Sequence, residues 1–176
     1  MGKEHDGIDA VAEKFYQKFR DEGIYFWKTL SELSEEDILT SIFLLGNKNE
    51  DNESLCHALE YNRDYDMFGG IGGGTVSKYG LFYGVDGQWK ATQEQGKPKP
   101  VTLEKAIEIG KEIRDALVMG AITIQKWQGS LNTVESYCEM FKELDSVIPK
   151  YIHKSWFLKY YYMSFPDILL IYYSEE

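Results

Sequence analysis

The chain of 176 residues has few of the residues that build covalent or metal-held scaffolds: two cysteines, three histidines and four prolines. Cys56 and Cys138 stand far apart in segments with an amphipathic pattern, and neither belongs to a CxxC pair or a Cys/His cluster. A structural zinc site, which needs closely spaced ligands, is therefore not expected. We predict that both thiols are free and buried.

Long hydrophobic runs are also missing. No stretch approaches the roughly 18 uninterrupted apolar residues of a membrane span, and the start lacks the apolar segment of a secretory signal. We therefore expect a cytoplasmic protein. No linker, internal repeat or low-complexity tract divides the sequence, so residues 1–176 are expected to form a single domain.

Basic residues are scarce beside acidic ones, 19 against 29, which gives a formal net charge of -10 and argues against a broad phosphate-gripping surface. The acid excess lies in residues 1–60, with 14 acidic and 6 basic side chains, whereas residues 61–120 hold 8 of each. Residues 76–99 and 146–166 instead interleave lysines with aromatic residues. Two interpretations of these stretches are open. They are solvated faces, or they form a surface that binds a polyanion, because lysine contacts phosphates and an aromatic ring stacks on a base.

Hydrophobic periodicity predicts three amphipathic helices. The first covers residues 7–21, the second begins after the cap residue Thr102 and ends at Gly120, and the third covers residues 131–145 with Ser130 as its cap.

Shorter signals fill in the rest of the chain. A capping box at Ser34 predicts another helix, which Gly46 ends, and Ser54 to Tyr61 is either a short strand or a helical turn. The dipeptide at residues 86–87, Asp-Gly between two β-type runs, predicts a hairpin. Residues 168–173 are β-branched and apolar enough for a closing strand.

Five glycines fill six positions from Gly69 to Gly74, which no helix or strand interior would tolerate. They do not form a P-loop, because Lys78 follows Ser77 rather than a glycine, and no helix follows to complete a dinucleotide fingerprint. We predict a loop or strand kink here. No nucleophile–base pair or paired acid and base is indicated elsewhere, so we expect neither an enzyme nor a cofactor.

Three segments carry a family resemblance. Residues 70–83 read Gly-Ile-Gly-Gly-Gly-Thr-Val-Ser-Lys-Tyr-Gly-Leu-Phe-Tyr. Residues 154–160 read Lys-Ser-Trp-Phe-Leu-Lys-Tyr, and residues 165–174 read Phe-Pro-Asp-Ile-Leu-Leu-Ile-Tyr-Tyr-Ser. In these segments the chain resembles the N-terminal region of McrB-type AAA+ restriction GTPases, the targeting subunits of modification-dependent restriction systems. The resemblance spans roughly residues 54–174.

The resemblance implies a DNA-recognition domain, the N-terminal part of a longer chain, with a GTPase motor in cis and a nuclease subunit in trans. It also implies an α+β fold with a curved, barrel-like mixed sheet and flanking helices, as in the PUA-like superfamily with its EVE and YTH domains. In such a domain a methylated base flips out of the DNA stack into an aromatic pocket, and stacking and hydrogen bonds recover the cost of flipping.

Candidate DNA contacts are aromatic or lysine residues, together with one serine. Trp89 is the leading one, because it follows the predicted hairpin turn beside a lysine. The full set is Trp89, Lys78, Tyr79, Ser77, Trp27, Tyr61, Trp156, Lys90, Lys97 and Lys99. For each aromatic residue, plain core packing is the competing interpretation.

Two other functions stay open. The chain could be a protein-interaction or oligomerisation domain whose acidic first third docks a partner, or a PUA-like RNA-binding module.

Overall fold

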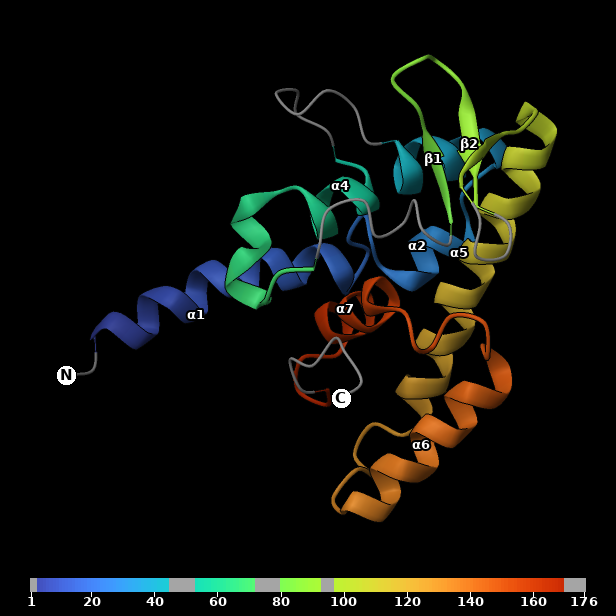
Figure 1. The fold of residues 1–176 in the computed structure, drawn as a ribbon. Helices are drawn as coiled ribbons and strands as arrows, with labels where there is room; N and C mark the ends of the chain where they lie inside the picture. The colour runs from blue at the N-terminus through green and yellow to red at the C-terminus, as the bar shows by residue number, and fades with distance from the viewer. Residues whose placement is uncertain (1–2, 45–52, 72–79, 93–96, 170–176) are drawn as a thin grey trace.

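The computed structural model describes residues 3–44, 53–71, 80–92 and 97–169, and most of them are helical (Figure 1). The helices are α1 (Lys3–Tyr16), η1 (Gln17–Phe19), α2 (Trp27–Ser31), α3 (Glu35–Ile38), η2 (Leu39–Phe43), α4 (Leu55–Glu60), η3 (Arg63–Phe68), α5 (Leu103–Lys126), α6 (Val134–Val147) and α7 (Ser155–Ser164). Three strands, β1 (Leu81–Tyr83), β2 (Trp89–Ala91) and β3 (Lys99–Pro100), form one antiparallel sheet in the order β1-β2-β3.

The predicted fold class, an α+β domain with a curved, barrel-like sheet of the PUA, EVE or YTH type, is wrong. Within the described residues the sheet is open and small, and none of its strands exceeds three residues. Leu55–Glu60 resolves the ambiguous segment as a helix. Ile168 and Leu169 lie in a bend and turn, not a strand, and residues 170–173 of the predicted closing strand lie outside the described residues.

The long helix α5 begins as predicted but ends later. The Thr102 hydroxyl accepts a hydrogen bond from the backbone N–H of Lys105 at 3.3 Å. The helix then passes through Gly120 and continues to Lys126. Gly120 is buried, and a Cβ there would collide with the hydroxyl of Tyr161. This glycine therefore permits α7 to pack closely on α5, and the prediction that it ends the helix is wrong.

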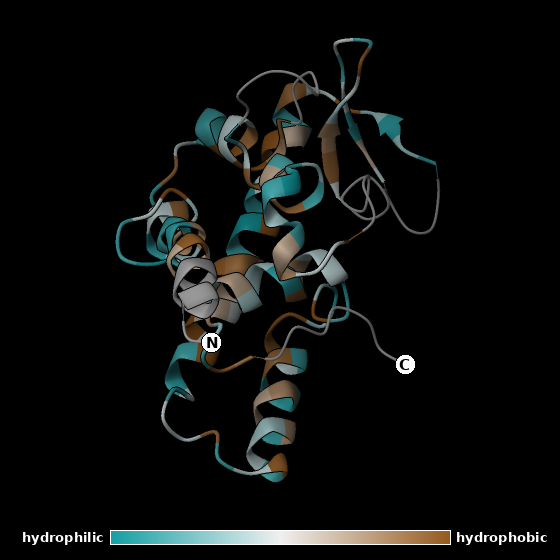
Figure 2. Cartoon of the chain, turned by 90° about the vertical axis from the view of Figure 1, so that its left-hand side faces the viewer, coloured by the Kyte–Doolittle hydropathy of each residue, from teal (hydrophilic) through white to brown (hydrophobic). Residues whose placement is uncertain are grey.

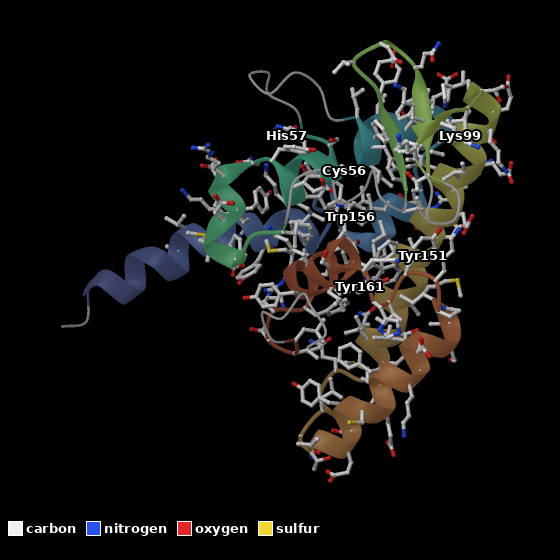
Figure 3. The ribbon with its side chains drawn as sticks, viewed as in Figure 1. Cys56, His57, Lys99, Tyr151, Trp156 and Tyr161 are labelled. Carbon is white, nitrogen blue, oxygen red and sulfur yellow. The ribbon has the colours of Figure 1, made fainter. Side chains whose placement is uncertain are left out.

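Helix α7 lies at the centre of the core (Figure 3). Trp156, Phe157, Tyr160 and Tyr161 are each at most 1% exposed. The Tyr160 hydroxyl donates to the carbonyl of Tyr25 at 3.0 Å, and the Tyr161 hydroxyl donates to the carbonyl of Ala116 in α5 at 2.9 Å. This aromatic run is thus a buried helix, and its hydroxyl groups join it to neighbouring segments.

The other predicted elements are largely present. Helices α1 and η1 cover the helix predicted at 7–21 up to Phe19, and α6 has the expected amphipathic character but begins later, with Thr133 rather than Ser130 as its cap. The helices carry bands of polar and apolar residues, as expected of helices with one buried side (Figure 2). Of the two thiols, both free, Cys56 is buried as predicted, whereas Cys138 is exposed.

The Asp-Gly hairpin is confirmed. Strands β1 and β2 pair antiparallel, with Leu81 opposite Ala91 and Tyr83 opposite Trp89. Gly87 in the turn has a φ of 76°, a conformation that glycine adopts without steric cost. Leu81 and Ala91 are buried, so the base of the hairpin is anchored in the core while its turn projects outward (Figure 1).

One cation lies inside this core. Lys159 of α7 is 2% exposed, and its Nζ donates to the carbonyl of Leu59 at 3.0 Å. Burial lowers the pKa of Lys159 from 10.5 to about 8, against the attraction of the Asp66 and Glu60 carboxylates. The ammonium group therefore links α7 to α4 at a cost in desolvation.

The close approach at Gly120 predicts that Gly120→Ala destabilises the protein. Because the overlap with the Tyr161 ring is severe, we expect overpacking to cost about 2–3 kcal/mol, and after the ~1 kcal/mol that alanine gains in a helix the free energy of unfolding should fall by about 1–2 kcal/mol. Urea denaturation measures it. Gly70→Ala is the control, because a Cβ there meets nothing within 4 Å. A Gly120→Ala protein as stable as the wild type would contradict the close packing.

The buried cation predicts a pH-dependent difference between the wild type and Lys159→Met. The unfolded chain holds this proton up to about pH 10.5 and the folded protein only to about pH 8, so the lysine's contribution to stability rises between these values. Lys159→Met should be the more stable protein at pH 7 and lose that advantage from pH 8 to 10. Urea denaturation across this range tests it, with exposed Lys142→Met as the control. Parallel curves for the wild type and Lys159→Met would show that burial does not perturb the lysine.

Candidate functional site

The described residues include seven of the ten candidate DNA contacts, and the structure places them in three regions. Trp89, Lys90 and Lys99 belong to the small sheet, and Lys97 lies just before β3. Trp27 begins α2, while Tyr61 and Trp156 lie at α4 and in α7. The remaining three candidates, Ser77, Lys78 and Tyr79, lie outside the described residues.

The sheet brings four of the candidates together. Trp89 packs edge-on against Tyr83 across the hairpin, with ring centroids 5.1 Å apart and planes at 62°. Strand β3 adds Lys99 opposite Ala91, on the far side of β2. We call Tyr83, Trp89, Lys90, Lys97 and Lys99 the hairpin surface. Tyr83 is a contributor that the sequence analysis did not single out, although its place across the predicted turn from Trp89 could have revealed it.

The lysines of the hairpin surface differ in how far their charges are already neutralised. Lys90 Nζ lies 2.7 Å from Asp86, and its hydrogen bond and charge hold the pKa of that carboxyl below its usual range. Lys97 and Lys99 are exposed and form no ion pair with a described carboxylate. Lys97 and Lys99 are therefore the cations of this surface that remain available to an anionic partner.

Tyr61 and Trp156 lie elsewhere. Tyr61 is half-buried at the end of α4 and stacks on His57 at a centroid distance of 6.3 Å. Trp156 is fully buried beside Phe157, with rings 5.4 Å apart, and its indole N–H has no hydrogen-bond partner among the described residues. The structure thus places Trp156 in the core, where no base reaches it while the fold is intact.

Trp27 lines an open cleft of about 210 Å³ between η1, α2, the end of α5 and the turn after α7. We call it the Trp27 cleft. Its walls include the rings of Phe26, Trp27 and Phe165 and the polar side chains of Gln125, Gln128 and Asp167. The rings of Phe26 and Trp27 are 5.5 Å apart, and Lys28 Nζ lies 5.4 Å from the Trp27 centroid.

An ion pair adjoins this cleft. Arg20 Nη2 and Asp167 Oδ2 are 3.5 Å apart although 147 positions separate the two residues. The Arg20 guanidinium also lies 5.3 Å from the centroid of the Tyr16 ring. Sequence reasoning found Trp27 but not its polar neighbours, because only tertiary folding brings η1, α5 and the turn at Asp167 together.

The two regions offer charged groups, carboxamides and aromatic rings. Among the described residues no group of three His, Cys, Asp or Glu side chains could hold a metal ion. In the same part of the chain no helix is long and apolar enough to cross a membrane. The hairpin surface offers cations beside aromatic rings, and the Trp27 cleft offers rings beside carboxamides.

No protein-family model, curated protein or solved structure matches the chain. The resemblance to restriction GTPases therefore stays a prediction that rests on the sequence segments quoted above.

The placement of the tryptophans predicts which of them a solute reaches. Acrylamide should quench Trp27, Trp89 and Trp127, which are half-buried, but not Trp156. Replacing Trp156 with Phe should therefore raise the quenchable fraction of the tryptophan emission, and Trp27→Phe should lower it. Stern–Volmer titrations of both variants and the wild type measure this fraction. The opposite order would show that Trp156 is accessible and would contradict its place in the core.

Proposed function

We propose that this chain is a DNA-recognition module that binds DNA carrying a modified, methylated base and acts in the cytoplasm to target a restriction complex. By the resemblance of its sequence, the module works with an AAA+ GTPase motor in cis and a nuclease subunit in trans. A base that is inspected by all its edges leaves the stack, and this flipping costs a few kcal/mol that the protein recovers by stacking and hydrogen bonding.

The observation that carries the proposal is the hairpin surface. Its two available cations, Lys97 and Lys99, belong to β3, which pairs with β2, and to the segment before it. The half-exposed rings of Tyr83 and Trp89 belong to the same small sheet. Lysines contact phosphates without regard to sequence, whereas ring planes contact bases. One small surface therefore combines the two contacts that a nucleic-acid module needs.

The charge of the rest of the molecule sets how strong this binding is. With a net charge of -10 and few available lysines on the hairpin surface, phosphate contacts are few. Because each neutralised phosphate contributes about 0.9 to the slope of log K against log salt, we expect a slope of only about -2 to -3. The preference for modified DNA then comes from the contact with the base rather than from electrostatic attraction to the phosphates.

The proposal predicts that a duplex with a methylated base binds more tightly than its unmodified twin. Trp89→Ala should weaken binding about 5- to 100-fold, the worth of a base–aromatic stack. The double variant Lys97→Ala/Lys99→Ala should weaken binding to both duplexes alike and reduce the salt slope by about 2. Fluorescence anisotropy at several salt concentrations measures the affinity of the wild type and of both variants for each duplex, and the salt slope.

Lys14→Ala/Lys142→Ala is the matched control, since it removes two exposed lysines from α1 and α6 with the same change in charge. Equal affinity for modified and unmodified DNA, with 5-methylcytosine and with N6-methyladenine, contradicts the proposal. RNA that displaces modified DNA would instead indicate an RNA-binding module. No nucleic-acid binding at low salt, together with a concentration-dependent dimer, would indicate a protein-interaction domain.

A further inference from the structure

A flipped base needs a slot with a planar wall and polar groups at its edge, and the hairpin surface does not supply one. Trp89 makes a tilted, T-shaped contact with Tyr83 and packs against the core. The Trp27 cleft has the missing features, with rings on its walls and polar side chains beside them. Its volume of about 210 Å³ lies below the roughly 300–1,000 Å³ typical of sites for drug-sized ligands, so it suits a single ring system.

The polar side chains of the cleft favour one class of ring. Gln125 lies in the last turn of α5 and Gln128 in the turn that follows the helix, and both line the cleft. A carboxamide presents a donor beside an acceptor, which complements adenine, and a carboxylate such as Asp167 accepts a hydrogen bond from the amine of cytosine. Thymine and guanine carry a carbonyl oxygen where cytosine and adenine carry this amine, so they offer the acceptors no donor at that position.

Asp167 is available for such a contact. Its side chain is 86% exposed, and its pairing with Arg20 spans 3.5 Å at the surface. An exposed pair of this kind contributes only about 0–1 kcal/mol, so an incoming amine exchanges for the guanidinium at little cost. Arg20 and the nearby exposed Lys28 then remain for the phosphates that flank an extruded nucleotide.

We infer that the Trp27 cleft receives the extruded base and selects adenine or cytosine and their methylated forms, which carry an amine at purine C6 or pyrimidine C4, through Gln125, Gln128 and Asp167. As an account of how modified DNA is read, this inference rests on the proposed function.

The cleft and the hairpin surface are far enough apart to be tested separately. Strand β3 leads directly into the start of α5, whereas Gln125 lies at the other end of this helix. At 1.5 Å per residue, the 24-residue helix is about 36 Å long. A substitution in the cleft therefore leaves the phosphate contacts of the hairpin surface unchanged.

The first experiment titrates free deoxynucleosides and follows the tryptophan emission of the variant Trp89→Phe/Trp127→Phe, in which Trp27 is half-buried and the remaining Trp156 is fully buried. Deoxyadenosine, N6-methyldeoxyadenosine and deoxycytidine should quench it with dissociation constants on the order of 1 mM, and thymidine should not. Gln125→Leu/Gln128→Leu, which keeps the shape of the side chains, should abolish the quenching, whereas the control Gln17→Leu on η1 should not. Equal quenching by thymidine, or none by any nucleoside, overturns the inference.

The second experiment measures the affinity ratio of modified to unmodified duplex. Gln125→Leu/Gln128→Leu and Trp27→Ala should lower this ratio about tenfold while the affinity for unmodified DNA and the salt slope stay as in the wild type. A ratio that survives both variants overturns the inference and leaves the proposed function intact. Nucleosides that bind as expected, with a wild-type duplex ratio of one, support the cleft as a base site and overturn the proposed function instead.

Discussion

Helix α7 has almost no exposed side, and the positions of the other elements follow from how its polar atoms are satisfied. A tyrosine hydroxyl or an ammonium group inside a core costs free energy unless it finds a hydrogen-bond partner. Tyr160, Tyr161 and Lys159 meet this requirement with carbonyl groups of the segment before α2, of α5 and of α4. These bonds fix three segments around one helix, so a shift of any of them leaves a buried polar atom unpaired.

The same burial explains why the fold was predicted only in part. Helices with one apolar side, such as α1, α5 and α6, show a period of 3.6, and the Asp-Gly turn gives the hairpin directly. Helix α7 is apolar on all sides and rich in tyrosine and phenylalanine, so it shows no period and its residues favour strands. The predicted helix end at Gly120 was wrong for a related reason. In the sequence, a glycine that makes room for Tyr161 cannot be distinguished from a glycine that ends a helix.

The two candidate regions also differ in how far the sequence predicts them. Neighbours in sequence made the hairpin surface predictable, since Trp89, Lys90, Lys97 and Lys99 lie within eleven positions. The Trp27 cleft joins segments from both ends of the chain, and Arg20 and Asp167 meet across it. No local pattern encodes that meeting. It depends on α7, which carries Phe165 and Asp167 at its end and whose Tyr160 is bonded to the segment before Trp27.

The protein thus has a buried centre around α7 and two surfaces that we propose bind DNA. Hydrogen–deuterium exchange of the chain, alone and with a duplex containing a methylated base, tests this division most directly. It predicts that the amides of α7 exchange slowest in both samples, and that DNA slows exchange at the sheet, at α2 and at the end of α5. Protection confined to α6, or fast exchange in α7, would contradict it.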